Sequence, residues 1–394
     1  MRILHLATSS EGGAGIAAKR IVSAQNENGV EAKFISRDNQ AKSSQNRLSV
    51  LLGKIVTFST KFVTNKRYGF VSPYSVSTIN LQEIQSFKPD IINIHNWYNF
   101  LSLSDILKLS NSYPIVFTLH DSRIATGGCH VTLGCKSFET ECKKCPAVKS
   151  SSIVSLSKLH SDRVFSKMGP YAVVSPSNWL INELRESNAL RASEYSCVIH
   201  NPIKRTEYPV REHLSKETTK VLFVSASLDS EFKGLRMLMN ALEIYSRAYP
   251  DSKLQVKFVG DTTQNYNWNH LNVDVINAGV LDQESLQILM SNSDLLVVPS
   301  QSDNFPSVIS EAQLAGLLVV GTKVGGIPEM IEDGITGVVS ENNASDFADA
   351  IYRAIKLIDK DRVVSAARIK ASERSDESEI ANQYSLLYKR MLQI

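Results

Sequence analysis

The segment 295–316 brings together residue types that can bind a nucleotide. Its apolar start, 295–298, predicts a short buried strand, and Pro306 suits the first turn of a following helix. Backbone N–H groups at such a helix start favour a phosphate group, because the helix dipole adds to their positive partial charge. Asp303 precedes the helix, and Glu311 lies one turn inside it, where its carboxylate can accept hydrogen bonds from a ribose diol. This strand-helix unit therefore predicts a nucleotide site.

The spacing of the two carboxylates is D-x7-E within PSQSDNFPSVISEA, and GTKVGGIPEMIEDGITG follows. This stretch resembles the E-x7-E element of the retaining glycosyltransferases of family four, although the family usually has Glu where Asp303 stands. The resemblance implies an α/β architecture, the GT-B fold, with two Rossmann-like domains facing a central cleft. It also implies a nucleoside-diphosphate sugar donor, no metal required for catalysis, and a role for Asp303 in positioning the donor sugar. The implied donor contacts are Asn304, Phe305, Pro306, Ser307 and Glu311, with the base beside Gly279 and Val280.

A lysine-glycine pair in the segment FKG resembles the family's diphosphate clamp. Relatives usually carry an arginine about six residues before this lysine, and here that position is Ser227. The departure leaves Lys233 as the main candidate cation for the leaving diphosphate, with Lys323 or Arg236 as alternatives that could compensate. Because charge grows on that diphosphate as the glycosidic bond breaks, we expect Lys233 to be catalytic.

A glycine-rich loop follows the first predicted strand, RILHLA, and leads into a helix expected from about Ile16 to Asn28. Gly13, Gly15 and Ala18 fit G-x-G-x-x-A, with Asp38 near the end of a second strand, so a dinucleotide site is an alternative. The chain would then be a nicotinamide-dependent oxidoreductase. In the resembling family the same loop lies close to the donor phosphates and the acceptor, which makes Gly13 and Gly15 expected donor contacts without any nicotinamide.

Two histidines follow predicted strands at 90–95 and 115–119. Ligands of open α/β sheets bind beyond the carboxyl ends of the strands, so His95 and His120 both face the expected site. The segment FTLHD resembles the family segment whose histidine contacts the donor sugar, which makes His120 a predicted catalytic residue. HNWYN resembles a segment common in colanic-acid and capsule transferases, and for its histidine, His95, we expect a hydrogen-bonded structural role.

Four cysteines lie within TGGCHVTLGCKSFETECKKC, at Cys129, Cys135, Cys142 and Cys145. The C-x2-C end is good zinc chemistry, because two thiolates on one tight turn can occupy two corners of a tetrahedron. A structural zinc site is one interpretation, and free thiols that pack a long loop, or occasional disulfides, are the other. Four thiolates would leave no open position, so a catalytic zinc is not expected.

Alternating strands and helices continue through all 394 residues, a length that predicts two domains. We expect an N-terminal domain at 1–203, a polar linker at 204–218, a nucleotide-sugar domain at 219–374, and a last helix at 375–394 that crosses back to the N-terminal domain. With 43 basic and 40 acidic residues the net charge is only +3, which gives no case for nucleic-acid binding. No signal peptide or long apolar run is present, so we expect a cytoplasmic protein.

A basic stripe is predicted on a helix near residues 47–62, where Arg47, Lys54 and Lys61 fall seven apart. It is either a solvated face or a contact for anionic lipid head groups or a pyrophosphate-linked acceptor. The combined features predict a retaining glycosyltransferase, peripheral to the membrane, that extends a lipid-linked or oligosaccharide acceptor of a bacterial surface glycan. The alternative is a protein that binds nucleotide sugars without transferring them, and Ser227 in place of arginine is its best support.

Overall fold

The computed structural model describes residues 1–39, 64–204, 208, 218–264, 266, 273–357 and 360–393. The chain divides into two compact units. Unit 1 consists of Met1–Pro202 together with Glu377–Ile394, and unit 2 consists of Ile203–Asp376. The predicted basic stripe at Arg47, Lys54 and Lys61 and most of the predicted linker lie outside the described residues.

Unit 1 is built on a parallel sheet of six strands in the order β2-β1-β3-β4-β5-β6. The strands are β1 (Arg2–Ala7), β2 (Glu31–Ser36), β3 (Ile91–Ile94), β4 (Ile115–Thr118), β5 (Tyr171–Ser175) and β6 (Tyr195–Val198). Its helices are α1 (Gly12–Glu27), α3 (Leu81–Phe87), α4 (Leu103–Ser110), α5 (Ser151–Phe165), α6 (Asn178–Leu184), α7 (Asn188–Arg191) and α13 (Glu377–Leu392). Because all strands are parallel, their carboxyl ends meet at one edge of the sheet.

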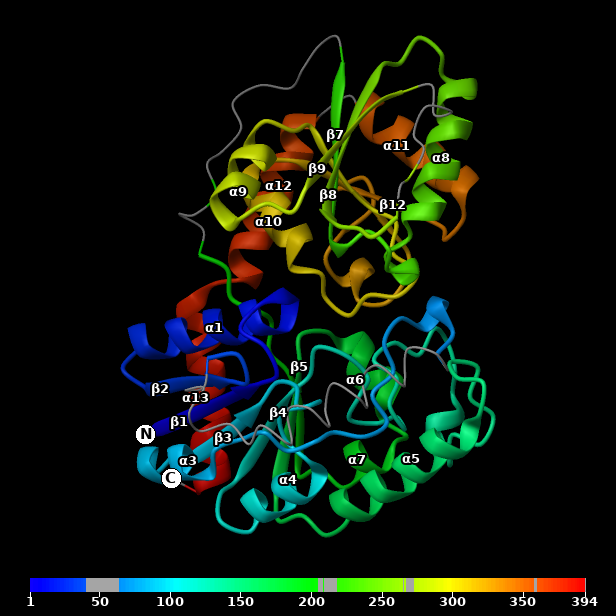
Figure 1. Cartoon of the computed structure of the whole chain (residues 1–394). Helices are drawn as coiled ribbons and strands as arrows, with labels where there is room; N and C mark the ends of the chain where they lie inside the picture. Colours follow the sequence, from blue (N-terminus) through cyan, green and yellow to red (C-terminus); the bar gives the residue numbers. More distant parts are fainter. Residues whose placement is uncertain are drawn as a thin grey trace. The chain divides into compact units, whose positions relative to one another are not determined.

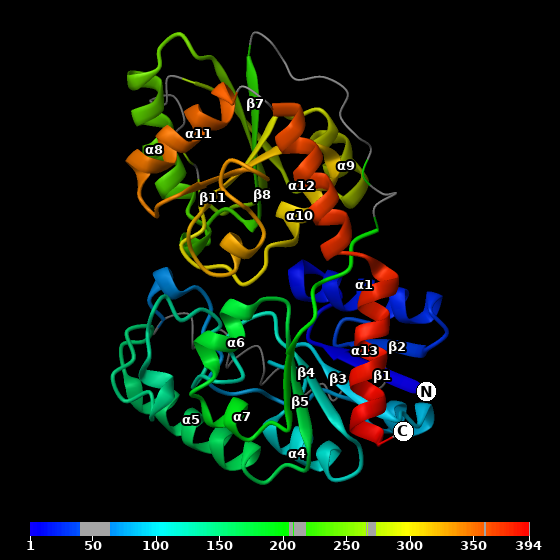
Figure 2. The same cartoon turned by 180° about the vertical axis from the view of Figure 1, so that it is seen from behind.

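Both faces of the unit 1 sheet are buried, which is why its strands are apolar at consecutive positions. Ile3 and Ile91 pack with Ile21 of α1 and with Ile380 and Tyr384 of α13. The alternate strand positions face a second layer that includes α4, α5 and α6. Figure 1 labels α1 and α13 together beside β1 and β2, and the reverse view in Figure 2 agrees. The last helix of the chain is thus part of the first unit's core.

Unit 2 repeats the plan with strand order β12-β11-β10-β7-β8-β9, again parallel throughout. The strands are β7 (Thr219–Ser227), β8 (Leu254–Asp261), β9 (Asp274–Gly279), β10 (Leu295–Val298), β11 (Leu318–Thr322) and β12 (Val338–Ser340). The helices are α8 (Leu235–Ala248), α9 (Gln283–Ser291), α10 (Ser307–Ala315), α11 (Ala344–Lys356) and α12 (Lys360–Arg374). Helices α8 and α11 cover one face, and α9, α10 and α12 cover the other (Figure 1).

The chain enters and leaves unit 2 at neighbouring points. The backbone N–H of Ile203 donates to the carbonyl of Ser375 over 3.1 Å, so the entering and departing segments are hydrogen-bonded to each other. Ser375 follows the end of α12 and is buried.

None of the helices in the described part of the chain combines the length and the apolar character that a bilayer-spanning helix needs.

Candidate functional site

Three segments meet at the carboxyl edge of the unit 2 sheet, and two glycines allow their close approach. Gly234 follows the short 3-10 turn Glu231–Lys233 with φ of +80°, and a Cβ there would overlap the carbonyl oxygen of Pro299. Gly325 has φ of +61°, and a Cβ there would overlap the carbonyl oxygen of Asp303. The lack of a side chain and the left-handed backbone both require glycine at these positions. The loop between β10 and α10 is therefore held from both sides.

Backbone and hydroxyl hydrogen bonds hold the same loop in place. The N–H of Gln301 donates to the carbonyl of Phe232 over 2.7 Å, and the N–H of Gly326 donates to that of Asp303 over 3.0 Å. The hydroxyl of Thr322, at the end of β11, donates to the carbonyl of Ser300 over 2.5 Å. These bonds fix the backbone of the predicted donor-binding segment without using its side chains.

Lys233 and Asp303, predicted for two different parts of the donor, form an ion pair. Lys233 Nζ donates to Asp303 Oδ2 over 2.6 Å, and the Ser300 hydroxyl donates to the same oxygen over 3.2 Å. The lysine side chain is 29% exposed and the aspartate 13%, so solvent reaches the pair. The structure thus brings the candidate cation next to the candidate sugar-binding carboxylate, just before the start of α10.

Helix α10 begins at Ser307, one residue after Pro306, which the sequence places in the first turn. The residue before it, Pro306, supplies no side-chain hydrogen bond to the first turn, which suits an anion seat at that turn. Asn304, Phe305 and Glu311 are buried at 8%, 7% and 8% exposure. The predicted donor contacts of this segment therefore lie on one rigid loop and the first two turns of one helix.

Arg374, at the end of α12, supports this helix and was not expected from the sequence. Its Nη2 donates to the Ser310 hydroxyl over 2.9 Å and to Gln313 Oε1 over 2.7 Å, and its guanidinium lies 5.8 Å from the centre of the Phe305 ring. Burial lowers the pKa of Arg374 to about 10, which leaves it charged at neutral pH. No local motif marks this arginine, because its partners lie more than sixty residues away in the sequence.

The remaining candidates of unit 2 lie along the same edge. Gly279 ends the edge strand β9, and Val280 after it is 71% exposed. In the sheet, β9 lies two strand spacings from β7, a distance of roughly 10 Å. Arg236 is exposed on α8, while Lys323 is 62% exposed and pairs with Glu341 at 3.4 Å. Neither cation contacts the Lys233–Asp303 pair in the described hydrogen bonds and ion pairs.

The candidate residues of unit 1 lie at the carboxyl edge of its own sheet. His120 follows β4, and its Nε2 lies 3.0 Å from Nδ1 of His95, which follows β3. His95 Nε2 lies 2.9 Å from Nδ1 of His5, a buried residue of β1. Burial lowers the pKa of His120 and of His5 to about 4, and burial with the neighbouring histidines lowers that of His95. All three imidazoles are therefore neutral near pH 7.

The glycine loop of unit 1 is tied to Asp38. Helix α1 begins at Gly12, earlier than predicted, because Gly15 lets its first turn pack against the backbone of Ser9. Gly13 is exposed and a Cβ there would meet open space. Burial opposes ionisation of Asp38, but hydrogen bonds from Ser36 and Ser10 outweigh it and lower its pKa to about 2. With its carboxylate used by this loop, Asp38 is poorly suited to bind the ribose of a dinucleotide.

The four loop cysteines surround one cavity of about 20 Å³ that Phe138 and Thr126 also line. All are free thiols. Yet within the described residues no three His, Cys, Asp or Glu side chains are grouped so that they could hold a metal ion. This geometry gives no support to a structural zinc at Cys129, Cys135, Cys142 and Cys145.

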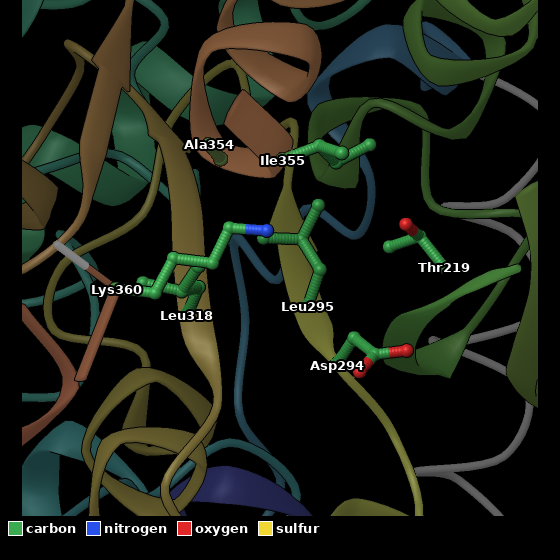
Figure 3. Close-up of a pocket in the computed structure, with 7 residues that line it drawn as sticks. All are labelled: Thr219, Asp294, Leu295, Leu318, Ala354, Ile355 and Lys360. Atoms are coloured by element: carbon green, nitrogen blue, oxygen red, sulfur yellow. The ribbon is translucent and has the colours of Figure 1, made fainter. Parts of the chain in front are cut away.

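A different pocket lies at the opposite, amino edge of the unit 2 sheet. Thr219, Asp294 and Leu318 stand at or next to the starts of β7, β10 and β11, and Figure 3 shows them with Lys360 of α12. The backbone N–H of Lys220 donates to Asp294 over 2.7 Å. Ligands of parallel sheets bind at the carboxyl edge, so this pocket is separate from the donor site.

The residues predicted for the donor thus fall into two groups. Unit 2 holds Lys233, Gly279, Val280, Asp303, Asn304, Phe305, Pro306, Ser307 and Glu311 along one edge, and unit 1 holds Gly13, Gly15 and His120 along the matching edge of its own sheet.

Two doubly wound parallel sheets of this kind are the architecture of GT-B glycosyltransferases. Over 99% of this chain and 100% of the other, the structure is similar to Anabaena HepE in complex with UDP and glucose, with a TM-score of 0.65 and 18% identity. The profile described as Glycosyltransferase Family 4 matches residues 11–207, and that described as Glycosyl transferases group 1 matches residues 218–356. The chain belongs to glycosyltransferase family 4.

Curated relatives match parts of the chain. A putative colanic acid biosynthesis glycosyl transferase, WcaC of Escherichia coli, is 26% identical over 64% of each chain. An uncharacterized protein in the cps region of Klebsiella pneumoniae is 28% identical over 45% of this chain and 48% of its own. The chain thus spans about half to two thirds of these relatives' lengths.

Proposed function

We propose that this protein is a retaining glycosyltransferase that moves a sugar from a nucleoside diphosphate to a growing, lipid-linked bacterial surface glycan such as an O-antigen, capsule or exopolysaccharide. The observation that carries the proposal is the Lys233–Asp303 pair beside the first turn of α10. A positive helix end and an ammonium group next to each other suit a diphosphate. UDP is the proposed diphosphate, supported by the UDP in the complex of the similar protein HepE.

Each candidate residue has a part in the proposed reaction. The β-phosphate gains negative charge as the glycosidic bond breaks, and Lys233 and the N–H groups of α10 stabilise that charge. Glu311 accepts hydrogen bonds from the ribose hydroxyls, and Gly279 and Val280 seat the base. Asp303 and His120 hold the donor sugar. The glycine loop at Gly13 and Gly15 lies near the phosphates and the acceptor.

The acceptor and the cellular location belong to the same proposal. Similarity to WcaC and to the cps-region protein supports a surface polysaccharide acceptor. The basic stripe at Arg47, Lys54 and Lys61 would attach the protein to the inner face of the cytoplasmic membrane, because anionic lipids attract clustered cations. No metal is needed for the chemistry, and no nucleic acid is involved.

A donor screen tests the proposal. Purified protein is incubated with individual UDP- and GDP-sugars and a lipid-linked oligosaccharide acceptor, and the acceptor's mass gain is measured. One hexose-sized addition from one donor is expected. Saturable binding of a donor with neither transfer nor hydrolysis would instead favour the binding-protein alternative, whose support is Ser227 at the usual arginine position.

A further inference from the structure

A continuous path of hydrogen-bonded side chains runs through the core of unit 1 from α13 to His120. Each member except His120 is buried, and each contact joins side chains from segments that lie far apart in the sequence. In order along the path the members are Tyr384, Thr118, Asn93, Tyr388, Gln25, His5, His95 and His120. The last helix of the chain is thereby connected to the candidate sugar-binding histidine.

Such a path has a direction, because each neutral imidazole carries one N–H and one acceptor nitrogen. If His5 donates from Nδ1, then His95 must accept at Nε2 and donate from Nδ1, and His120 must accept at Nε2. His120 would then carry its proton on Nδ1. If the path runs the other way, all three carry their protons on Nε2 and His120 offers a bare Nδ1.

The hydroxyl of Thr118, next to the far end of the path, decides the direction. The hydroxyl of Tyr384 is fully buried, and within the described contacts its partner is the hydroxyl of Thr118, at 3.2 Å. A buried O–H without an acceptor is costly, so Tyr384 donates to Thr118. The hydroxyl of Thr118 then donates to Asn93 Oδ1 over 2.9 Å, and Asn93 Nδ2 donates to the oxygen of Tyr388 over 3.0 Å.

The same reasoning orients Gln25. As it lies in the structure, its Oε1 is 2.9 Å from His5 Nε2 and its Nε2 donates to the Tyr388 oxygen over 3.2 Å. Tyr388 then accepts two hydrogen bonds, and its own proton has no acceptor among the described side chains. Turning the amide by 180° keeps both contacts, because the two ends of an amide have nearly the same shape. Tyr388 then donates to Oε1, and Nε2 donates to His5.

We infer that Tyr388, acting through Gln25, His5 and His95, fixes His120 in the tautomer that carries its proton on Nδ1. Tyr388 is a positioning residue, and it makes His120 a hydrogen-bond donor at the carboxyl edge of the unit 1 sheet. That the group receiving this hydrogen bond is an oxygen of the donor sugar rests on the proposed function. The low pKa values of the three histidines agree with this arrangement, since the path requires each imidazole to be neutral.

Two-bond ¹H–¹⁵N correlation spectra of histidine-labelled full-length protein at pH 7.5 test the inference without any substrate. The protein has eight histidines, and the signals of His120 are assigned by their loss in the His120→Asn protein. His5, His95 and His120 are all expected to show the Nδ1–H pattern. The Nε2–H pattern at His120 would overturn the inference, whatever the protein transfers.

Tyr388→Phe removes the hydroxyl that orients Gln25, and Tyr384→Phe is its matched control from the same helix. In Tyr388→Phe, His120 should show partial or complete conversion to the Nε2–H tautomer. The kcat of the Tyr388→Phe protein should fall about fivefold to tenfold, with a smaller change in its KM for the donor. In Tyr384→Phe the hydroxyl of Thr118 still donates to Asn93, so the tautomer should be unchanged and kcat should stay within about twofold.

The three measurements separate the inference from the proposed function. An unchanged His120 tautomer in folded Tyr388→Phe would remove Tyr388 from its positioning role. If Tyr388→Phe does not fold, the wild-type spectrum still decides the direction of the path. An Nδ1–H tautomer in a protein that transfers no sugar would contradict the proposed function and leave the hydrogen-bond path standing.

Discussion

The ammonium nitrogen of Lys233 lies 2.6 Å from Oδ2 of Asp303, seventy residues further along the chain. In the structure, the cation proposed for the diphosphate is therefore neutralised by the carboxylate proposed for the sugar. Under the proposed function, an arriving diphosphate must share or replace this partner of Lys233. An ion pair that is partly solvated contributes little to stability, which leaves both groups available for the ligand.

Replacing Lys233 with Ala should lower kcat about a hundredfold and change donor affinity much less, because charge on the leaving diphosphate grows in the transition state. Single-turnover transfer and donor titration by calorimetry measure the two effects. Lys323→Ala removes a lysine paired at the surface and serves as the control. Wild-type turnover in Lys233→Ala would exclude this lysine from the mechanism.

Replacing Glu311 with Gln should weaken UDP binding about tenfold, since a neutral amide loses the charge-assisted hydrogen bonds to the ribose hydroxyls. The melting temperature without ligand should change little, because the substitution keeps the side chain's shape. Glu284→Gln, at an exposed position of α9, is the control. Equal UDP affinity in the Glu311 and Glu284 variants would remove Glu311 from the site.

Acid should destabilise unit 1 through its histidines. The folded-state pKa of His5 and of His120 is about 4, below the ordinary value of 6.5, so the unfolded chain binds more protons between these values. Stability is therefore present above about pH 6.5 and is lost as the pH falls toward 4. Each histidine adds a slope of up to about 1.4 kcal/mol per pH unit.

Urea unfolding at pH 7.5, 6.0 and 5.0 measures this dependence. His5→Asn should flatten it, whereas His160→Asn, at an exposed position of α5, should leave it unchanged. Stability that stays constant from pH 7.5 to 5.0 would mean that the histidines are charged or exposed in the folded protein.

Cys145 should be the first thiol to react. The hydrogen bond with Cys129 lowers the pKa of Cys145 to about 6 and raises that of Cys129. Iodoacetamide at pH 7 followed by peptide mass mapping should find Cys145 modified first, and Cys129→Ala should slow that reaction, while Cys197→Ala should not. One equivalent of tightly bound zinc in the purified protein would contradict the packed-thiol interpretation of this loop.

Reversing Arg47, Lys54 and Lys61 to Glu should reduce sedimentation with anionic vesicles, because each cation contributes up to about 1 kcal/mol of attraction. Transfer to a lipid-linked acceptor should slow, while transfer to a short water-soluble acceptor should not. High salt should have the same effect as the triple variant, since exposed charges are screened over roughly 8 Å at physiological ionic strength. Undiminished vesicle binding by the triple variant would leave the basic stripe as a solvated face.

Local patterns predicted much of the fold because local interactions decide those elements. Helix α4 (Leu103–Ser110) is an example, because Ser102 and Asp105 form a capping box at its start. The buried strand Leu295–Val298 has the bounds that its apolar run predicts. The alternation of such elements indicated two parallel α/β sheets, and both sheets have that form.

The sequence does not predict two helices that bury polar or small side chains. Helix α5 buries polar Ser157 and Lys158 between the apolar residues Val154 and Val164. Lys158 is satisfied by an ion pair with Asp162, and Ser157 by the carbonyl of Pro73, a partner eighty-four residues away. Helix α12 turns a stripe of small residues inward. In neither helix does the hydrophobic pattern reveal the buried face, because tertiary contacts create it.

The individual candidate residues could be named from motifs, but their contacts could not. Nothing in the spacing of Lys233 and Asp303 indicates an ion pair, because the strand order that brings β7 beside β10 creates it. His5 and His95 stand ninety residues apart and meet for the same reason. Motifs therefore located the chemistry of this chain, and only the sheet topology shows which groups touch.

The paired backbones at Ile203 and Ser375 have a consequence for how the protein is made. Unit 2 is an insertion within the sequence of unit 1, whose core is incomplete until α13 leaves the ribosome. During synthesis unit 2 can fold first. The apolar surface of β1 and β3 stays exposed until Ile380 and Tyr384 of residues 377–394 are made and cover it. Truncation within α13 would therefore disrupt the core of unit 1, which contains the amino-terminal residues. Unit 2, which directly precedes α13 in the sequence, would stay folded.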